Sequence, residues 1–134
     1  MKFSHEKLIV YQRSLDFIEY TNKIFADSSL SINAYQQLDR ASSSVTLNIA
    51  EGTGKFTIRD KNHYYDIARG SALECSGCLD ILLRRKRITA VLVDEGKSIL
   101  VEIVSMLIGL TKSSSDRVYE HSIEYEIHDD DLKT

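Results

Sequence analysis

The 134-residue chain contains no proline. Proline in a helix interior removes a hydrogen bond and clashes with the preceding turn, so its absence lets long helices run unbroken. The length suits one domain with a real core, which buries roughly two-thirds of the unfolded surface. A hydrophobic fraction of 43% and a charged fraction of 28% exclude a disordered or fibrous chain.

Long apolar runs are also missing. The most apolar stretch, Ile99 to Leu110, is shorter than the roughly 20 residues that a membrane span needs, and it contains Glu102. Met1 to Val10 carries charges throughout and lacks the apolar core of a signal peptide. We therefore expect a cytoplasmic protein with no membrane partner.

Cysteine is scarce, because Cys75 and Cys78 are the only two. Two cysteines this close on one helix cannot form a disulfide framework, and a zinc site wants four ligands. The four histidines are scattered, so we expect no metal and no cofactor. Both cysteines fall on an apolar helical face, where we expect them to pack as small hydrophobic residues.

Catalytic motifs are absent as well. The serines at 42–44 and 71 have no nucleophile elbow and no histidine in a catalytic relation. Gly52-Thr53-Gly54-Lys55 resembles the end of a phosphate loop, but Ile49 and Phe56 occupy positions that need glycine and a hydroxyl residue. We expect no enzyme and no catalytic residue. Instead, Gly52 is predicted to be the left-handed cap that ends a helix.

The net charge of −3 is unevenly distributed. Residues 113–134 hold seven acids against two bases, a net of −5, whereas residues 1–112 hold 15 bases and 13 acids, a net of +2. Residues 122–128 alternate apolar and polar side chains with the period of a strand. We expect an acidic tail over 113–134, either disordered or an arm that pairs with a partner.

Four amphipathic patterns with apolar side chains at spacings of three and four fill residues 1–112. Their members are Leu8, Tyr11, Leu15, Ile18 and Phe25; Tyr35, Leu38, Ser42, Val45 and Ile49; Tyr64, Ala68, Ser71, Cys75, Cys78 and Leu82; and Leu92, Gly96, Ile99, Ile103, Met106 and Leu110. Ser4, Ser31, Thr57 and Thr89 are predicted N-caps. Short connections between long helices predict an all-α, antiparallel up-down-up-down four-helix bundle.

Two of these helices carry a second apolar stripe. Its members are Val10, Phe17 and Ile24 in the first helix, and Val93, Leu100, Val104 and Leu107 in the fourth. A monomeric bundle needs one stripe per helix, so we expect part of this surface to face another subunit in a homo-oligomer. The alternative is a wider stripe inside the bundle.

Gly70 and Gly77 lie seven residues apart on one face of the third helix, and each costs about 1 kcal/mol of helix propensity relative to alanine. Close approach of another helix, within the bundle or from a second subunit, would compensate for this cost. Glu74 lies on the same stripe. It is either partly buried with Arg40 or Arg69 as its partner, or solvated.

Basic residues are concentrated near the two ends of the third helix. Arg84, Arg85, Lys86 and Arg87 follow one another at its end, and Lys55, Arg59 and Lys61 lie near its start. One interpretation is a surface that contacts the phosphates of nucleic acid. The other is a solvated helix end, because cations at a helix C-terminus are favoured by the helix dipole.

Two segments carry a resemblance to a known family. Arg40 to Phe56 and Asp66 to Glu74, within a match over about residues 3–112, resemble the signature of the bacterial 23S ribosomal RNA intervening-sequence proteins. The signature positions are Arg40, Asn48, Glu51, Gly52, Arg69, Gly70 and Glu74. The resemblance implies a cytoplasmic all-α bundle that assembles into a homopentamer without established enzymatic activity. It also implies that Asn48 and Glu51 fix the turn after the second helix, with Arg69 as a partner.

A related branch, the accessory variability determinants of retroelements, binds nucleic acid and a reverse transcriptase through a basic pentamer. This chain differs from that branch in its negative charge and its acidic tail. The leading hypothesis is a non-enzymatic homo-oligomeric module that binds RNA, DNA or a nucleic-acid enzyme. The alternative is a protein-interaction scaffold that uses its tail without binding nucleic acid.

Overall fold

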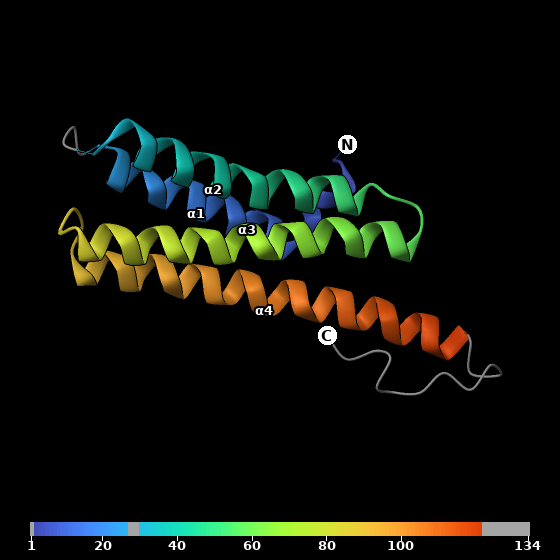
Figure 1. The fold of residues 1–134 in the computed structure, drawn as a ribbon. Helices are drawn as coiled ribbons and strands as arrows, with labels where there is room; N and C mark the ends of the chain where they lie inside the picture. The colour runs from blue at the N-terminus through green and yellow to red at the C-terminus, as the bar shows by residue number, and fades with distance from the viewer. Residues whose placement is uncertain (1, 27–29, 122–134) are drawn as a thin grey trace.

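The computed structural model describes the backbone of residues 2–26 and 30–121, and side chains up to Lys112. A short 3-10 helix (Ser4–Lys7) precedes four α-helices, which are α1 (Ile9–Phe25), α2 (Ile32–Thr53), α3 (Ile58–Arg84) and α4 (Ala90–His121). α2 packs between α1 and α3, and α4 packs against α3 and α1 (Figure 1). Consecutive helices run in opposite directions, which confirms the predicted antiparallel bundle.

Side-chain caps mark three of the four helix starts as predicted. The hydroxyl oxygens of Ser31, Thr57 and Thr89 accept hydrogen bonds from backbone N–H groups three residues later, at 3.1, 3.1 and 3.2 Å. The cap predicted at Ser4 is wrong, because α1 begins only at Ile9, after the 3-10 helix. There the Glu6 carboxylate accepts from the Phe3 N–H at 3.2 Å and closes the short turn on itself.

The buried face of α1 differs from the predicted one. Val10, Ser14, Phe17, Thr21 and Ile24 are buried at alternating spacings of four and three, whereas the predicted core residue Leu15 is 38% exposed. The Ser14 and Thr21 hydroxyls donate to carbonyls of the preceding turn of α1, both at 2.6 Å. Because both hydroxyls are hydrogen-bonded within α1, these two polar residues can lie on the buried face of the helix.

The second apolar stripes lie inside the protomer. Val10, Phe17 and Ile24 pack in the core, as do Val93, Leu100 and Leu107 of α4, while Val104 is half-buried against it. The prediction that this stripe faces another subunit is therefore wrong. α4 lies between α1 and α3, so it buries a wide stripe against two neighbours.

α4 is longer than the sequence pattern predicted. It continues through Ser113-Ser114-Ser115 to His121 and extends beyond the α2–α3 connection (Figure 1). Serine costs only a few tenths of a kcal/mol in a helix relative to alanine, so three serines do not end one that packing has started. The strand pattern predicted at 122–128 lies outside the described residues.

Candidate nucleic-acid interface

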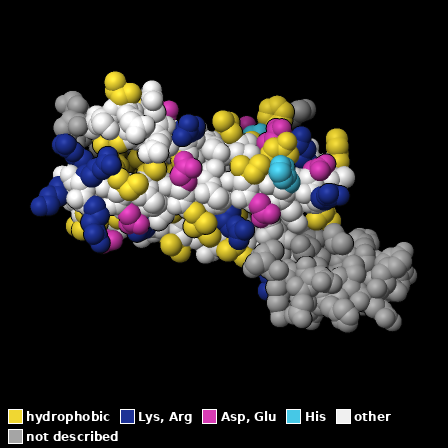
Figure 2. All heavy atoms as spheres, in the orientation of Figure 1, with side chains coloured by type: hydrophobic (Ala, Val, Ile, Leu, Met, Phe, Trp, Pro, Cys, Tyr) yellow, Lys and Arg dark blue, Asp and Glu magenta, His cyan; other side chains and the backbone are white. Residues whose placement is uncertain are grey.

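The two basic groups lie at opposite ends of the bundle. α3 connects them with 27 residues, a length of about 40 Å. Arg84 to Arg87 lie where α3 ends and α4 begins, while Lys55, Arg59 and Lys61 lie beside the α2–α3 connection. Figure 2 shows basic side chains gathered at the end of the bundle where α3 ends. The fold therefore presents two separate basic surfaces rather than one.

The first group, Arg84 to Arg87, is exposed and held by a defined turn. Lys86 has a positive φ of 59°, in the left-handed region that glycine usually occupies. The N–H groups of Lys86 and Arg87 donate to the carbonyls of Leu83 and Leu82, both at 2.9 Å. Among the described residues these four cations form no ion pair. We call this surface the basic end.

The second group is partly engaged in holding the α2–α3 connection. Lys55 Nζ lies 3.4 Å from a Glu51 carboxylate oxygen and 5.1 Å from the centre of the Tyr64 ring. Lys61 Nζ donates to the Thr53 carbonyl at 2.8 Å, at the end of α2. Arg59 is exposed. Two of the three cations thus have structural contacts, which makes this end the weaker candidate.

Gly52 has a different role from the predicted one. It lies inside α2, its φ is not positive, and the helix ends at Thr53 with Gly54 as a right-handed cap. The prediction of a left-handed cap at Gly52 is therefore wrong. A Cβ at Gly52 would lie 3.0 Å from the Tyr64 Cβ and 3.1 Å from the Lys61 carbonyl oxygen. Close packing of α2 on α3 is the reason for glycine at this position.

The polar signature residues do not form one cluster. The Asn48 side-chain amide donates to the Ser44 carbonyl at 2.8 Å, one turn back along α2, and Glu51 pairs with Lys55. Arg69 pairs with Asp66 at 3.8 Å on its own helix, so it is not the partner of the α2–α3 turn that the resemblance implied. Arg40 and Glu74 are exposed, which confirms the solvated alternative for Glu74.

Gly70 and Gly77 are exposed on α3, and a Cβ at either would meet nothing within 4 Å. Close approach of another helix within the protomer is therefore wrong. The same face of α3 exposes Ile67, Leu73 and Ile81 by 39, 59 and 49%. The protomer thus leaves uncovered a helix face that combines apolar side chains, glycines and the exposed carboxylate of Glu74.

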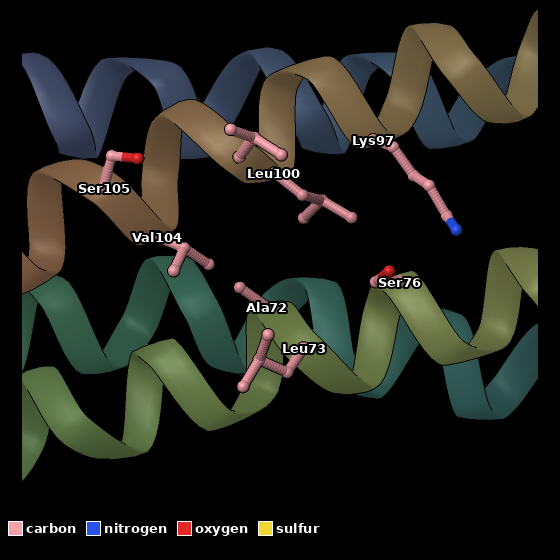
Figure 3. A pocket seen from close by; sticks show the side chains of 8 residues that line it. Ala72, Leu73, Ser76, Lys97, Leu100, Val104 and Ser105 are labelled. Carbon is pink, nitrogen blue, oxygen red and sulfur yellow. The ribbon is translucent and has the colours of Figure 1, made fainter.

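A shallow apolar groove of about 190 Å³ lies between α3 and α4 (Figure 3). Leu73, Leu100 and Val104 line it. Lys97 is its only charged residue, and its Nζ is engaged with Asp80 at 2.5 Å. Because its walls are mainly apolar and its one charged side chain is already paired, the groove is suited to apolar contact.

A second groove, at the basic end, contains polar residues that belong to no motif in the sequence. Asn33 and Gln37 of α2 line it together with Arg85. Their spacing of four residues places the two amides on one helix face. The start of α2 lies beside the end of α3 only because the two helices are antiparallel. The sequence around Asn33 and Gln37 therefore did not indicate a site.

The two cysteines are buried and free, which confirms their prediction as packing residues. Burial raises the pKa of the Cys75 thiol to about 12, and Cys78 and Glu74 add smaller effects in the same direction. Burial also raises the pKa of Cys78; Glu74 adds to this and Arg40 opposes it. Both thiols are therefore protonated at neutral pH.

We expect both cysteines of the folded protein to resist iodoacetamide at pH 8. A thiol with a pKa of about 12 is ionised in roughly one molecule in 10,000 at that pH. Mass spectrometry after timed labelling measures the reaction, with urea-unfolded protein as the control that should label at both positions. Rapid labelling of folded Cys75 would show that the thiol is not held in the core.

Two further findings apply to the described residues. None of their helices is both long enough and apolar enough to cross a membrane. They contain no group of three or more histidine, cysteine, aspartate or glutamate side chains placed to hold a metal ion.

Comparison with known proteins finds a matching family model and similarity to solved structures. A family model described as 23S rRNA-intervening sequence protein matches residues 6–109. A solved structure of a protein of unknown function from the S23 ribosomal protein family of Bacteroides thetaiotaomicron is similar to the chain, with 25% identity and a TM-score of 0.72. The similarity covers 78% of this chain and 99% of that one. No curated protein matches the chain.

Proposed function

The chain belongs to the family of 23S rRNA-intervening sequence proteins, and on this premise we propose that it is a non-enzymatic, homo-oligomeric accessory module that binds RNA or DNA. The basic end is the observation that carries the proposal. Four successive cations are exposed there on a fixed turn. Nearby lysines are neutralised, since Lys23 pairs with Glu95 and Lys97 with Asp80, both at 2.5 Å.

Phosphate contacts supply most of the affinity of sequence-independent nucleic-acid binding, and arginine donates two parallel hydrogen bonds to a phosphate. A helix that ends in arginines can therefore contact a nucleic-acid backbone without a groove that reads bases. Repeating the same end around a homo-oligomer would bring these cations together and strengthen the local positive field at that end.

We propose no catalytic activity, because the tyrosine and cysteine groups with a raised pKa serve packing. Burial raises the pKa of Tyr20 to about 12, and its hydroxyl donates to the Leu92 carbonyl at 2.5 Å. The Cys75 and Cys78 thiols lie in the core. None of these groups has a hydrogen-bonded general base in the described part of the chain.

The proposal is tested by binding of the full-length protein to a labelled single-stranded RNA and to a DNA duplex. We expect binding in 50 mM salt that weakens steeply toward 200 mM, because bound counterions are released from the phosphates. Fluorescence anisotropy measures both affinities. Absence of binding to either nucleic acid at 50 mM salt would contradict the proposed function.

We further propose that the exposed apolar face of α3 lies between subunits of the oligomer, with a pentamer as the assembly that the family resemblance implies. This face combines Ile67 and Leu73 with two glycines that nothing in the protomer covers. Small residues allow the close approach of a second helix, which would offset the low helix propensity of Gly70 and Gly77.

Replacing both Gly70 and Gly77 with alanine is expected to raise protomer stability and weaken assembly. Each alanine adds about 1 kcal/mol of helix propensity where no neighbour in the protomer is disturbed, but it obstructs a closely packed subunit. Light scattering is expected to give five times the 15.2 kDa chain mass for the wild type and less for the variant. A monomeric wild type would contradict the proposed assembly.

A further inference from the structure

A groove runs between the first turns of α2 and the last turns of α3, at the basic end of the bundle. It consists of two adjoining hollows of about 300 and 250 Å³, which share Ala34, Leu82 and Arg85 in their walls. Together they fall within the roughly 300–1,000 Å³ range of small-molecule sites. The groove is thus large enough for a nucleotide.

The two sides of the groove carry different donors and acceptors. Arg85 and Arg87 line it from the end of α3 and the following turn, while Asn33 and Gln37 line it from α2. A guanidinium group offers a planar fork of N–H donors that matches two phosphate oxygens, and it has no acceptor. A side-chain amide both donates and accepts, as the edge of a nucleobase does.

Apolar side chains lie between these polar groups. Leu30, Ala34 and Leu82 line the hollow that Arg85 and Arg87 share, and Ile81 lines the hollow with the two amides. Ile81 is 49% exposed, so it offers a surface on which a flat ring can pack. An inorganic anion alone would not need this apolar surface, whereas a nucleotide has both a phosphate and a ring.

The backbone around the arginines is fixed. The left-handed turn at Lys86 lies between Arg85 and Arg87, and the Arg87 N–H donates to the Leu82 carbonyl at 2.9 Å. Neither guanidinium forms an ion pair among the described side chains. Two cations on a defined turn, next to amide and apolar side chains, form a binding groove rather than a diffuse basic surface.

We propose that this groove binds one nucleotide, with Arg85 and Arg87 on its phosphate group and Asn33 and Gln37 on its base. Two sources present this chemistry, a 5′-phosphorylated end of a single-stranded nucleic acid and a free mononucleotide. The inference rests on the proposed function for the first source. The groove itself is tested without it, because AMP is a sufficient probe.

The experiment uses the full-length protein and three probes, a short RNA with a 5′-phosphate, the same RNA with a 5′-hydroxyl, and AMP. The 5′-phosphate is expected to tighten RNA binding about tenfold, the effect of one good charge-assisted contact. AMP is expected to compete for this preference. Replacement of both Arg85 and Arg87 with glutamine should abolish the preference and AMP binding.

A matched control removes the same charge outside the groove. Arg59→Gln together with Arg84→Gln also neutralises two exposed arginines, but neither residue lines the two hollows. This variant should keep the tenfold preference, even where its overall RNA affinity falls. Gln37→Ala should weaken AMP binding without changing the binding of pyrophosphate, since pyrophosphate has no base. Thermal unfolding should show that all three variants remain folded.

The outcomes separate this inference from the proposed function. RNA binding with no 5′-phosphate preference and no AMP competition would overturn the nucleotide groove and leave the proposed function standing. AMP binding that needs Arg85 and Arg87, without binding of RNA or DNA, would support the groove as a mononucleotide site and contradict the proposed function. A preference that survives the loss of both arginines would also overturn the groove.

Discussion

Replacement of Gly52 by alanine is expected to lower the free energy of unfolding by about 2 kcal/mol. The new Cβ would lie 3.0 Å from the Tyr64 Cβ and 3.1 Å from both the Lys61 carbonyl oxygen and Tyr65 Cε1. Two of these atoms are fixed by the α3 backbone and cannot move by a change of rotamer. Overpacking of this kind costs about 1–3 kcal/mol, and alanine recovers at most about 1 kcal/mol of helix propensity.

The substitution at Gly52 would also weaken the contacts that join α2 to α3. Separation of the two helices would lengthen the hydrogen bond from Lys61 Nζ to the Thr53 carbonyl, now 2.8 Å, and the one between the Thr53 and Tyr65 hydroxyls, now 2.9 Å. For this reason we place the expected loss in the upper part of the range. Urea unfolding followed by circular dichroism measures it.

Gly54 supplies the matched control two residues away. A Cβ there would meet only carbonyl oxygens at 3.6 and 3.7 Å, and its φ of −80° suits any residue. Gly54→Ala should therefore change stability by less than about 0.5 kcal/mol. Equal effects of the two substitutions would contradict close packing as the reason for glycine at position 52.

Neutralisation of the basic end is expected to lower the affinity for single-stranded RNA at least about 100-fold in 50 mM salt. The variant combines Arg84→Gln, Arg85→Gln, Lys86→Gln and Arg87→Gln. Each lost phosphate contact removes a charge-assisted hydrogen bond and its counterion release, at about 1 kcal/mol per contact under these conditions. Fluorescence anisotropy with one RNA compares the variant and the wild type.

The control variant carries the same change in charge at the opposite end of the bundle. Lys2, Lys7, Arg59 and Lys112 are all exposed, and their replacement by glutamine removes four cations. A general electrostatic attraction would make the two variants equally weak. If the basic end is the contact surface, the RNA affinity of the control variant should fall by less than about tenfold.

Helix starts could be predicted from the sequence where a hydroxyl side chain satisfies a free backbone N–H. Ser31, Thr57 and Thr89 are such residues, and each accepts the expected hydrogen bond. Ser4 has the same chemistry but lies in a 3-10 turn that Glu6 closes. The local pattern alone does not distinguish the two situations, because the competing partner lies within the same turn.

The core was harder to predict where hydroxyl residues belong to it. Ser14 is buried because it donates to the Tyr11 carbonyl and accepts from Thr46 of α2 at 3.0 Å, so its polarity costs little. A prediction based on apolar residues alone omits such positions, and it therefore placed the buried face of α1 incorrectly. The buried seams of α2 and α3 agree with the prediction at Leu38, Val45 and Cys75, where the core positions are held by apolar side chains.

The candidate site also has a part that could be predicted from the sequence and a part that could not. The positive residues could be recognised from their succession in the chain, and the length of α3 separates the two groups. The groove at the basic end depends on α2 and α3 lying side by side in antiparallel order. Asn33 and Gln37 therefore became candidates only when the fold placed them opposite Arg85.

The most direct measurement is the salt dependence of RNA affinity for the wild type and for the variant with four glutamines at the basic end. Each phosphate contact contributes about 0.7 to the slope of the logarithm of affinity against the logarithm of salt concentration. Loss of four contacts should therefore make the slope of the variant shallower by about three. Equal slopes for the two proteins would contradict the proposal that the basic end binds nucleic acid.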